Sequence, residues 1–130
     1  MRRWTIATVL LAVAFYALAL SQAVYDATSP QGFAWHVVLR KAYSVGAFSL
    51  LGYCFRRALG ENGAPRTAAF WACVAGTAAY SGAIEAGQAL RGSTEGALWN
   101  AIDVACGAAG GAIGAVLGVR PAPFRAPPRR

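Results

Sequence analysis

Long apolar runs alternate with short polar links along this chain, and the alternation predicts its elements. A run of about 20 apolar residues is typical of a helix that crosses a membrane, and four such runs occur. They cover Trp4 to about Val24, a stretch within Phe33 to Phe55, Thr67 to about Ala89, and Ala97 to Val119. The pattern predicts an all-α polytopic membrane protein, a bundle of four transmembrane helices.

The links between these runs contain Gly and Pro, which favour turns. They span residues 25–32, 59–65 and 92–96. Because the last link is short, the third and fourth helices are expected to form an antiparallel hairpin. We expect a single domain over residues 1–120. The tail, residues 121–130, is rich in Pro and Arg and is expected to be disordered or to lie against anionic head groups.

Composition supports the membrane class, because 57% of the residues are hydrophobic and only 13% are charged. A soluble domain carries about 25% charged residues. The net charge of +7 would suit nucleic acid, but its distribution does not. Most basic residues fall on one side of the four predicted crossings: Arg2, Arg3, Arg56, Arg57, Arg66, Arg120, Arg125, Arg129 and Arg130. This distribution predicts that both termini are cytoplasmic and that no nucleic acid is bound.

The N-terminus allows two interpretations. Two arginines, an apolar run and the small residues around Ser21 and Ala23 resemble a secretory signal peptide with its cleavage site. The run from Trp4 to Leu20 is long for a signal peptide, and an uncleaved helix gives an even number of crossings. The sequence favours the uncleaved helix and leaves cleavage open.

Three cysteines, Cys54, Cys73 and Cys106, lie inside apolar runs. Neither CxxC nor a Cys/His ligand spacing occurs, so the sequence indicates neither a zinc site nor a disulfide framework. We therefore predict no metal and no other cofactor.

Polar residues share helix faces in three of the predicted helices, because positions three and four apart lie on one side. Thr77, Ser81, Glu85 and Gln88 are spaced in this way on the third helix. The same spacing relates Asn100 to Asp103 on the fourth helix and Lys41 to Ser44 on the second. Ionisable groups at membrane depth are costly and usually mark a functional site.

These groups fall at one level near the extracytoplasmic end of three helices, where they predict a polar pocket. Lys41 and Arg91 are placed to neutralise Glu85 and Asp103, as burial demands. The alternative is that these residues form structural ion pairs and hydrogen bonds that set the helix register.

A stripe of glycines continues the polar face of the fourth helix: Gly107, Gly111, Gly114 and Gly118. Small residues at this spacing allow a neighbouring backbone to approach closely. We expect packing within the chain rather than a dimer interface, and the oligomeric state stays open.

The same residues resemble the VanZ-like family of small bacterial membrane proteins. The resemblance lies in Glu85-Ala-Gly-Gln88, then Arg91-Gly-Ser-Thr, then Asp103 with the glycines that follow it. An earlier element, Ser44, Phe48 and Gly52, matches a further family spacing. In this chain Gly107 stands where the family usually has Asn, and Asn100 comes before the Asp instead. The resemblance covers about residues 40–118.

The resemblance implies a multi-pass protein of the bacterial inner membrane, linked to glycopeptide resistance of the teicoplanin type. Its partners are expected to be membrane lipids or lipid-linked precursors of the cell envelope.

Three functions remain open. In an enzyme acting on lipid head groups, Glu85 or Asp103 would be the general base. Substrate would be bound by Gln88, Arg91, Asn100, Lys41 and Ser44. A binding or scaffold protein without turnover would use the same pocket. A small transporter is disfavoured because no inverted repeat is visible.

Overall fold

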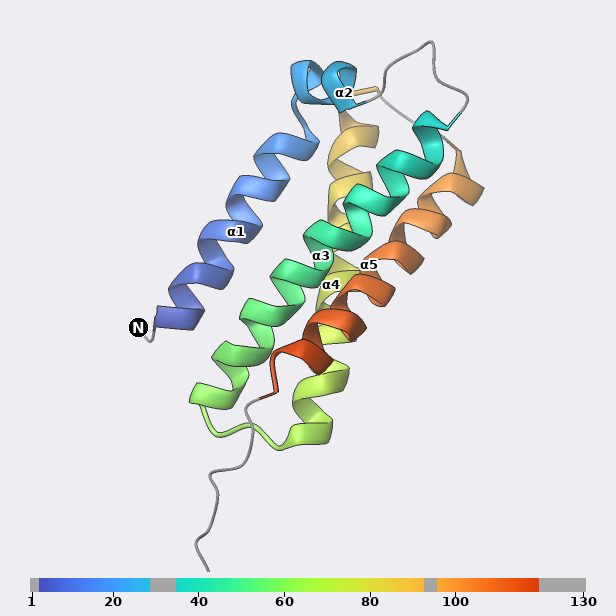
Figure 1. Ribbon diagram of the computed structural model, residues 1–130. Coiled ribbons are helices and arrows are strands. Elements are labelled where there is room, and N and C mark those ends of the chain that lie inside the picture. Colours follow the sequence, from blue (N-terminus) through green and yellow to red (C-terminus); the bar gives the residue numbers. More distant parts are fainter. Residues whose placement is uncertain (1–2, 29–34, 93–95, 120–130) are drawn as a thin grey trace, which may run out of the picture.

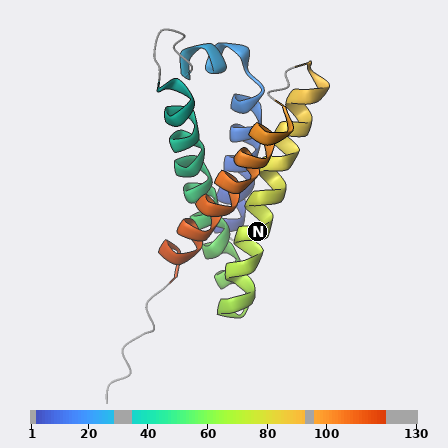
Figure 2. The ribbon, with the colours of Figure 1, turned by 90° about the vertical axis from the view of Figure 1, so that its right-hand side faces the viewer.

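The computed structural model describes residues 3–28, 35–92 and 96–119, which are almost entirely helical. Five helices follow one another: α1 (Arg3–Ala19), α2 (Gln22–Thr28), α3 (His36–Glu61), α4 (Arg66–Leu90) and α5 (Ala97–Leu117). The prediction of an all-α fold is thus confirmed for the described part of the chain. Four long helices run lengthwise in alternating directions, and α2 lies across the upper end (Figure 1, Figure 2).

Helix bounds follow the apolar runs, with one large extension. The helix expected to end near Phe55 continues to Glu61, and the link predicted over residues 59–65 shrinks accordingly. Gly63 ends it in the left-handed region, at φ +78°, where glycine has no steric penalty. The expectations for residues 29–34, 93–95 and the tail 121–130 lie outside the described residues.

The first helix ends earlier than expected, at Ala19 rather than near Val24, and the separate short helix α2 was not predicted. The cause lies in another helix. Gln88 Nε2 donates to the carbonyl of Ala19 at 3.1 Å, and Arg91 Nη1 donates to that of Leu20 at 2.8 Å. The last carbonyls of a helix lack partners within it, so the side chains of Gln88 on α4 and of Arg91 just after it stabilise the end of α1 at this point.

The closest packing joins α5 to α3 and α4 through the predicted glycine stripe. A Cβ atom on Gly52 of α3 would lie 2.9 Å from the Cα of Gly111 on α5. A Cβ on Gly107 would lie 2.9 Å from the backbone oxygen of Thr77 on α4. The α5 glycines therefore serve packing within the chain, as predicted. We call this contact of α3, α4 and α5 the glycine seam.

Helix α1 packs differently, against α3 and through large side chains. Leu11, Phe15 and Tyr16 lie against a buried group formed by Phe48, Leu51 and Ile84. Tyr80 of α4 packs edge-on against Phe48, with ring centroids 6.1 Å apart, and its hydroxyl donates to the carbonyl of Ala12. Such side chains hold the helices apart, which leaves room for the cavity described below.

Within the described residues, one helix, α5, is long and apolar enough to cross a membrane by length and composition. Helix α1 is apolar but has only 17 residues. The longer α3 carries charged residues near both ends, and α4 contains Thr77, Ser81 and several glycines, which lower its hydropathy although they face inward. The multi-pass bundle of four spans therefore remains a prediction.

Candidate functional site

A cavity of about 350 Å³ lies between the helices in the upper half of the bundle. Its apolar lining comes mainly from α1 and α3, with Phe15, Leu18, Tyr43, Ala47 and Phe48. Its polar lining comes from α3, α4 and α5: Arg40, Ser44, Ser81, Glu85, Gln88 and Asp103. Four of the residues singled out from helix spacing, Ser44, Glu85, Gln88 and Asp103, therefore line one cavity together with apolar side chains.

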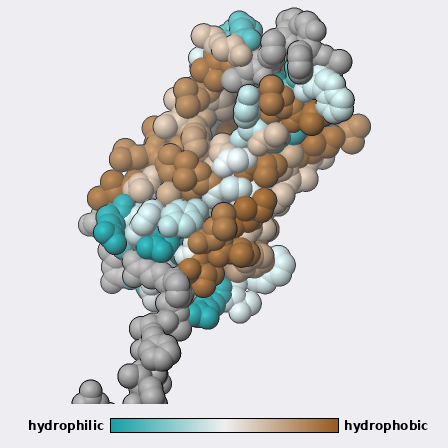
Figure 3. Space-filling model, viewed as in Figure 1, coloured by the Kyte–Doolittle hydropathy of each residue, from teal (hydrophilic) through white to brown (hydrophobic). Residues whose placement is uncertain are grey.

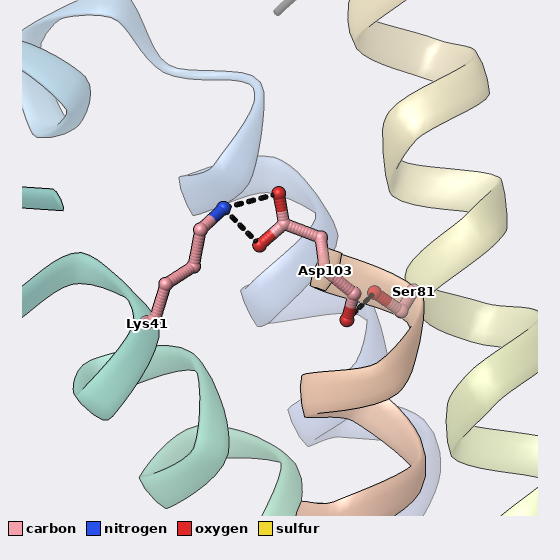
Figure 4. A network of polar contacts seen from close by, with 3 residues as sticks. All are labelled: Lys41, Ser81 and Asp103. Carbon is pink, nitrogen blue, oxygen red and sulfur yellow. Dashed lines mark hydrogen bonds and ion pairs between the residues drawn. The ribbon is translucent and has the colours of Figure 1, made fainter. Parts of the chain in front are cut away.

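Lys41 and Asp103 form the strongest polar contact at this level. Lys41 Nζ on α3 lies 2.6 Å from both carboxylate oxygens of Asp103 on α5, and Ser81 Oγ on α4 donates to the backbone oxygen of Asp103 at 2.9 Å (Figure 4). Three helices that are distant in sequence thus meet at Asp103. The predicted neutralisation of Asp103 by Lys41 is confirmed.

This ion pair is largely enclosed, with each side chain only 14% exposed. The Lys41 ammonium also lies 5.4 Å from the ring centroid of Trp99, within range of a cation–π interaction. Both oxygens of Asp103 accept from Lys41, and the ion pair would be lost if the carboxylate took up a proton from a substrate. The geometry favours a structural role for the pair.

The Glu85 side chain lies next to Asn100 of α5. With the Asn100 amide turned so that its nitrogen faces the carboxylate, it donates to Glu85 Oε2 at 3.0 Å and to the carbonyl of Gly96 at 3.1 Å. Amide orientation is assigned from such hydrogen-bond patterns. Glu85 therefore lines the cavity and contacts α5, as the helix spacing predicted.

Gln88 and Arg91 do not reach α5 through any hydrogen bond in the described structure. Gln88 lines the cavity, and its amide nitrogen donates to the end of α1. Arg91 is exposed and donates to the next carbonyl of α1. The predicted substrate-binding role of Arg91 has no support from its position, because its guanidinium binds outside the cavity lining.

Sequence reasoning missed two contributions to the cavity. Arg40 lines it, whereas the neighbouring Lys41 had been singled out. The α1 residues Phe15, Leu18 and Ala19 form one wall, although the sequence analysis assigned α1 no part in the site. The sequence did contain a signal for Arg40, because it directly precedes the basic residue Lys41. Nothing in the apolar run of α1 distinguishes the wall residues from their neighbours.

No group of three His, Cys, Asp or Glu side chains within residues 3–28, 35–92 and 96–119 is arranged to hold a metal ion. The three cysteines are free thiols, with Cys54 and Cys73 buried and Cys106 partly buried. The chemistry available at the cavity is therefore that of carboxylate, amide, hydroxyl and guanidinium groups.

Comparison with protein-family models, with curated proteins and with solved structures found no match to this chain. The resemblance to the VanZ-like family stays a prediction, and functional argument has to begin from the cavity itself.

Proposed function

We propose that this chain is a multi-pass membrane protein that crosses the bilayer with α1, α3, α4 and α5. The distribution of residue sizes supports this proposal. The buried positions of α4 and α5 are mostly small residues: Ala69, Cys73, Thr77, Ser81, Gly87, Gly107, Gly110, Gly111, Gly114 and Ala115. Large apolar side chains such as Leu10, Val13, Trp71 and Val116 are exposed instead. Small residues inside and large apolar ones outside are typical of helices packed in lipid.

On the face drawn in Figure 3, hydrophobic residues cover much of the middle and the most hydrophilic residues lie toward the two ends. At the lower end lie the described basic residues Arg3, Arg56, Arg57 and Arg66, close to the loop between α3 and α4 (Figure 1). The positive-inside rule then places this end in the cytoplasm. The cavity at the opposite end faces the outer side of a bacterial inner membrane.

The cavity supports binding of the polar head of a lipid or of a lipid-linked envelope precursor. The observation that carries this function is the mixed lining of the cavity, which has polar side chains such as Arg40, Glu85 and Gln88 together with apolar ones such as Phe15 and Leu18 of α1. An amphiphile needs both surfaces, polar for its head and apolar for the start of its chain. Ligand sites are commonly apolar pockets with a few placed polar groups.

Binding without turnover is the better supported form of this function. Asp103 is held by Lys41 and Glu85 by the Asn100 amide, so neither acid is presented as a ready base. Sequestering an envelope precursor also fits the teicoplanin-type resistance that the VanZ-like resemblance implies. An enzyme is the second candidate, with Glu85, which lines the cavity, as its general base.

Filling the cavity tests the binding function. Ser44→Phe places a ring in the cavity, whereas Ala42→Phe places one on the exposed side of the same helix. We expect Ser44→Phe to weaken binding of polyprenyl phosphate to the purified protein in nanodiscs at least about tenfold, a change of 1.4 kcal/mol. Ala42→Phe is expected to bind as the parent does. Equal binding by both variants would reject the cavity as the site.

Single-cysteine labelling tests the proposed topology. With Cys54, Cys73 and Cys106 replaced by Ala, an impermeant maleimide added outside is expected to label Leu90→Cys and to spare Asn62→Cys. Leu90, the last residue of α4, and Asn62, which directly follows α3, are both exposed and lie at opposite ends of the bundle. Labelling of Asn62→Cys in intact cells would reverse the orientation.

A further inference from the structure

The cavity reaches the molecular surface beside two of its lining residues. Among the described residues that line it, Leu18 of α1 is 49% exposed and Tyr43 of α3 is 55% exposed. Other lining residues, Phe48, Ser81 and Ile84, are buried. The cavity therefore opens where α1 and α3 adjoin, and we call the opening beside Leu18 and Tyr43 the mouth.

The mouth lies on the side of the bundle rather than at its end. Tyr43 lies about 10 Å below the start of α3 at His36. Helix α2 lies across the upper end (Figure 1), and its residue Val24 lines the cavity from there. Toward the lower end α1 and α3 close on each other, where Trp4 packs edge-on against Tyr53 at 5.6 Å between ring centroids. In the proposed membrane embedding, the mouth therefore faces lipid.

The lining of the cavity changes from polar to apolar with depth below the upper end. On α3 it runs from Arg40 to Phe48, which lies about 12 Å lower. On α4, which runs the other way, Gln88 lies about one turn above Ile84. Ser81 lies deeper still, but its hydroxyl donates to the backbone of α5. A polar head group is therefore favoured at the upper end and hydrocarbon below it.

The volume of the cavity limits how much of a lipid it can hold. A water molecule takes up about 30 Å³ of the liquid, so a cavity of about 350 Å³ holds about a dozen groups of that size. A phosphorylated head group with the first carbons of a chain is within this limit, whereas a complete polyprenyl or acyl chain exceeds it. The rest of the chain needs an apolar way out. The mouth provides one, because Leu18 is apolar and Tyr43 combines an apolar ring with a polar tip.

We propose that the hydrocarbon chain of the bound lipid leaves the cavity through the mouth and continues into the bilayer. This inference rests on the proposed binding function and adds the route and the class of ligand. The polar head lies at the level of Arg40 and Gln88, and the chain passes between Leu18 and Tyr43. The ligand is therefore a membrane lipid that enters sideways from the outer leaflet, not a soluble molecule that enters from water.

Site-specific cross-linking tests this route. A photoreactive benzophenone amino acid is placed singly at Leu18 or Tyr43 of the full-length protein, in nanodiscs that contain polyprenyl phosphate. The matched controls carry it at Ala17 or Ala42, which are exposed neighbours on the same helices and do not line the cavity. We expect saturable cross-links to the lipid from Leu18 and Tyr43, and only weak, non-saturable ones from the controls. Adding Ser44→Phe is expected to lower the saturable cross-links about tenfold, in proportion to its loss of binding.

The outcomes separate the route from the binding function. Equal cross-linking from all four positions, while Ser44→Phe still weakens binding, would overturn the mouth and keep the cavity as the site. No effect of Ser44→Phe on either binding or cross-links would overturn the binding function and the mouth with it. Dimethylallyl phosphate, which has the phosphate but only a short chain, is expected to compete weakly at equal concentration. Competition as strong as that of polyprenyl phosphate would show that a soluble phosphate fills the cavity, and would overturn the mouth.

Discussion

The two sides of α3 pack by opposite means. Toward α5, glycines remove side chains altogether, and backbone meets backbone near Gly52 and Gly111. Toward α1, large side chains such as Phe15 and Phe48 fill part of the interface and leave a cavity beside it. The first contact leaves no space for a ligand, while the cavity of about 350 Å³ lies beside the second.

This difference sets α1 apart from the other three long helices. The glycine seam joins α3, α4 and α5, and the Lys41–Asp103 pair ties the upper ends of α3 and α5. Helix α1 is attached through aromatic packing and through side-chain bonds to its last carbonyls. Ligand entry is therefore expected on the α1 side.

The largest loss of stability is expected from Gly114→Ala, in the glycine seam. Its new Cβ would lie 2.5 Å from the backbone nitrogen of Tyr53 and 2.8 Å from the carbonyl carbon of Gly52, and backbone atoms cannot turn away. We expect the free energy of unfolding to fall by about 3 kcal/mol, the upper end of the usual cost of overpacking, measured by denaturant titration in mixed micelles.

Gly46→Ala is the matched control for this prediction. Gly46 lies on α3, and a Cβ there meets nothing within 4 Å. Its substitution is expected to stabilise the helix by about 0.5–1 kcal/mol. Equal stability of the two variants would contradict a seam based on close backbone contact.

The next largest loss of stability is expected when the Lys41–Asp103 ion pair is broken. Lys41→Met leaves the Asp103 carboxylate enclosed without its counter-charge. Because each partner keeps some exposure, we expect a loss of about 2–3 kcal/mol, below the value for a fully buried pair. The double variant Lys41→Met/Asp103→Leu is expected to recover most of it. Additive losses in this cycle would show that the two residues do not interact.

A smaller effect is expected where α1 ends. Gln88→Leu removes the donor to the Ala19 carbonyl and is expected to cost about 1 kcal/mol. Amide hydrogen exchange is expected to rise in the last turn of α1 and to stay unchanged in α5. Faster exchange throughout the glycine seam would mean that the end of α1 is not stabilised independently of the seam.

The smallest effect on stability is expected from Glu85→Gln. The new amide oxygen still accepts from Asn100, so the unfolding free energy is expected to change by less than about 1 kcal/mol. Polyprenyl phosphate binding and teicoplanin susceptibility are the informative readouts, because loss of the charge alters the cavity. A large fall in melting temperature would assign Glu85 a structural role, and unchanged binding would remove it from the site.

Much of this architecture follows from local patterns. Apolar runs defined the four long helices, because each must bury or embed a continuous apolar surface. The i, i+3 and i, i+4 spacing placed Ser81, Glu85 and Gln88 on one face of α4, and the glycine stripe indicated its own packing. These features depend only on residues close in sequence.

The partners of those residues were decided by tertiary structure. Lys41 and Arg91 both matched the acids by charge, yet Lys41 pairs with Asp103 while Arg91 binds the end of α1. The helix break at Leu20 could not be predicted from a local Gly or Pro, because neither occurs there. The groups that stabilise it, Gln88 and Arg91, lie about 70 positions away at the end of α4. Helix periodicity sets the direction of a side chain, but what it meets depends on how distant helices are rotated and shifted against one another.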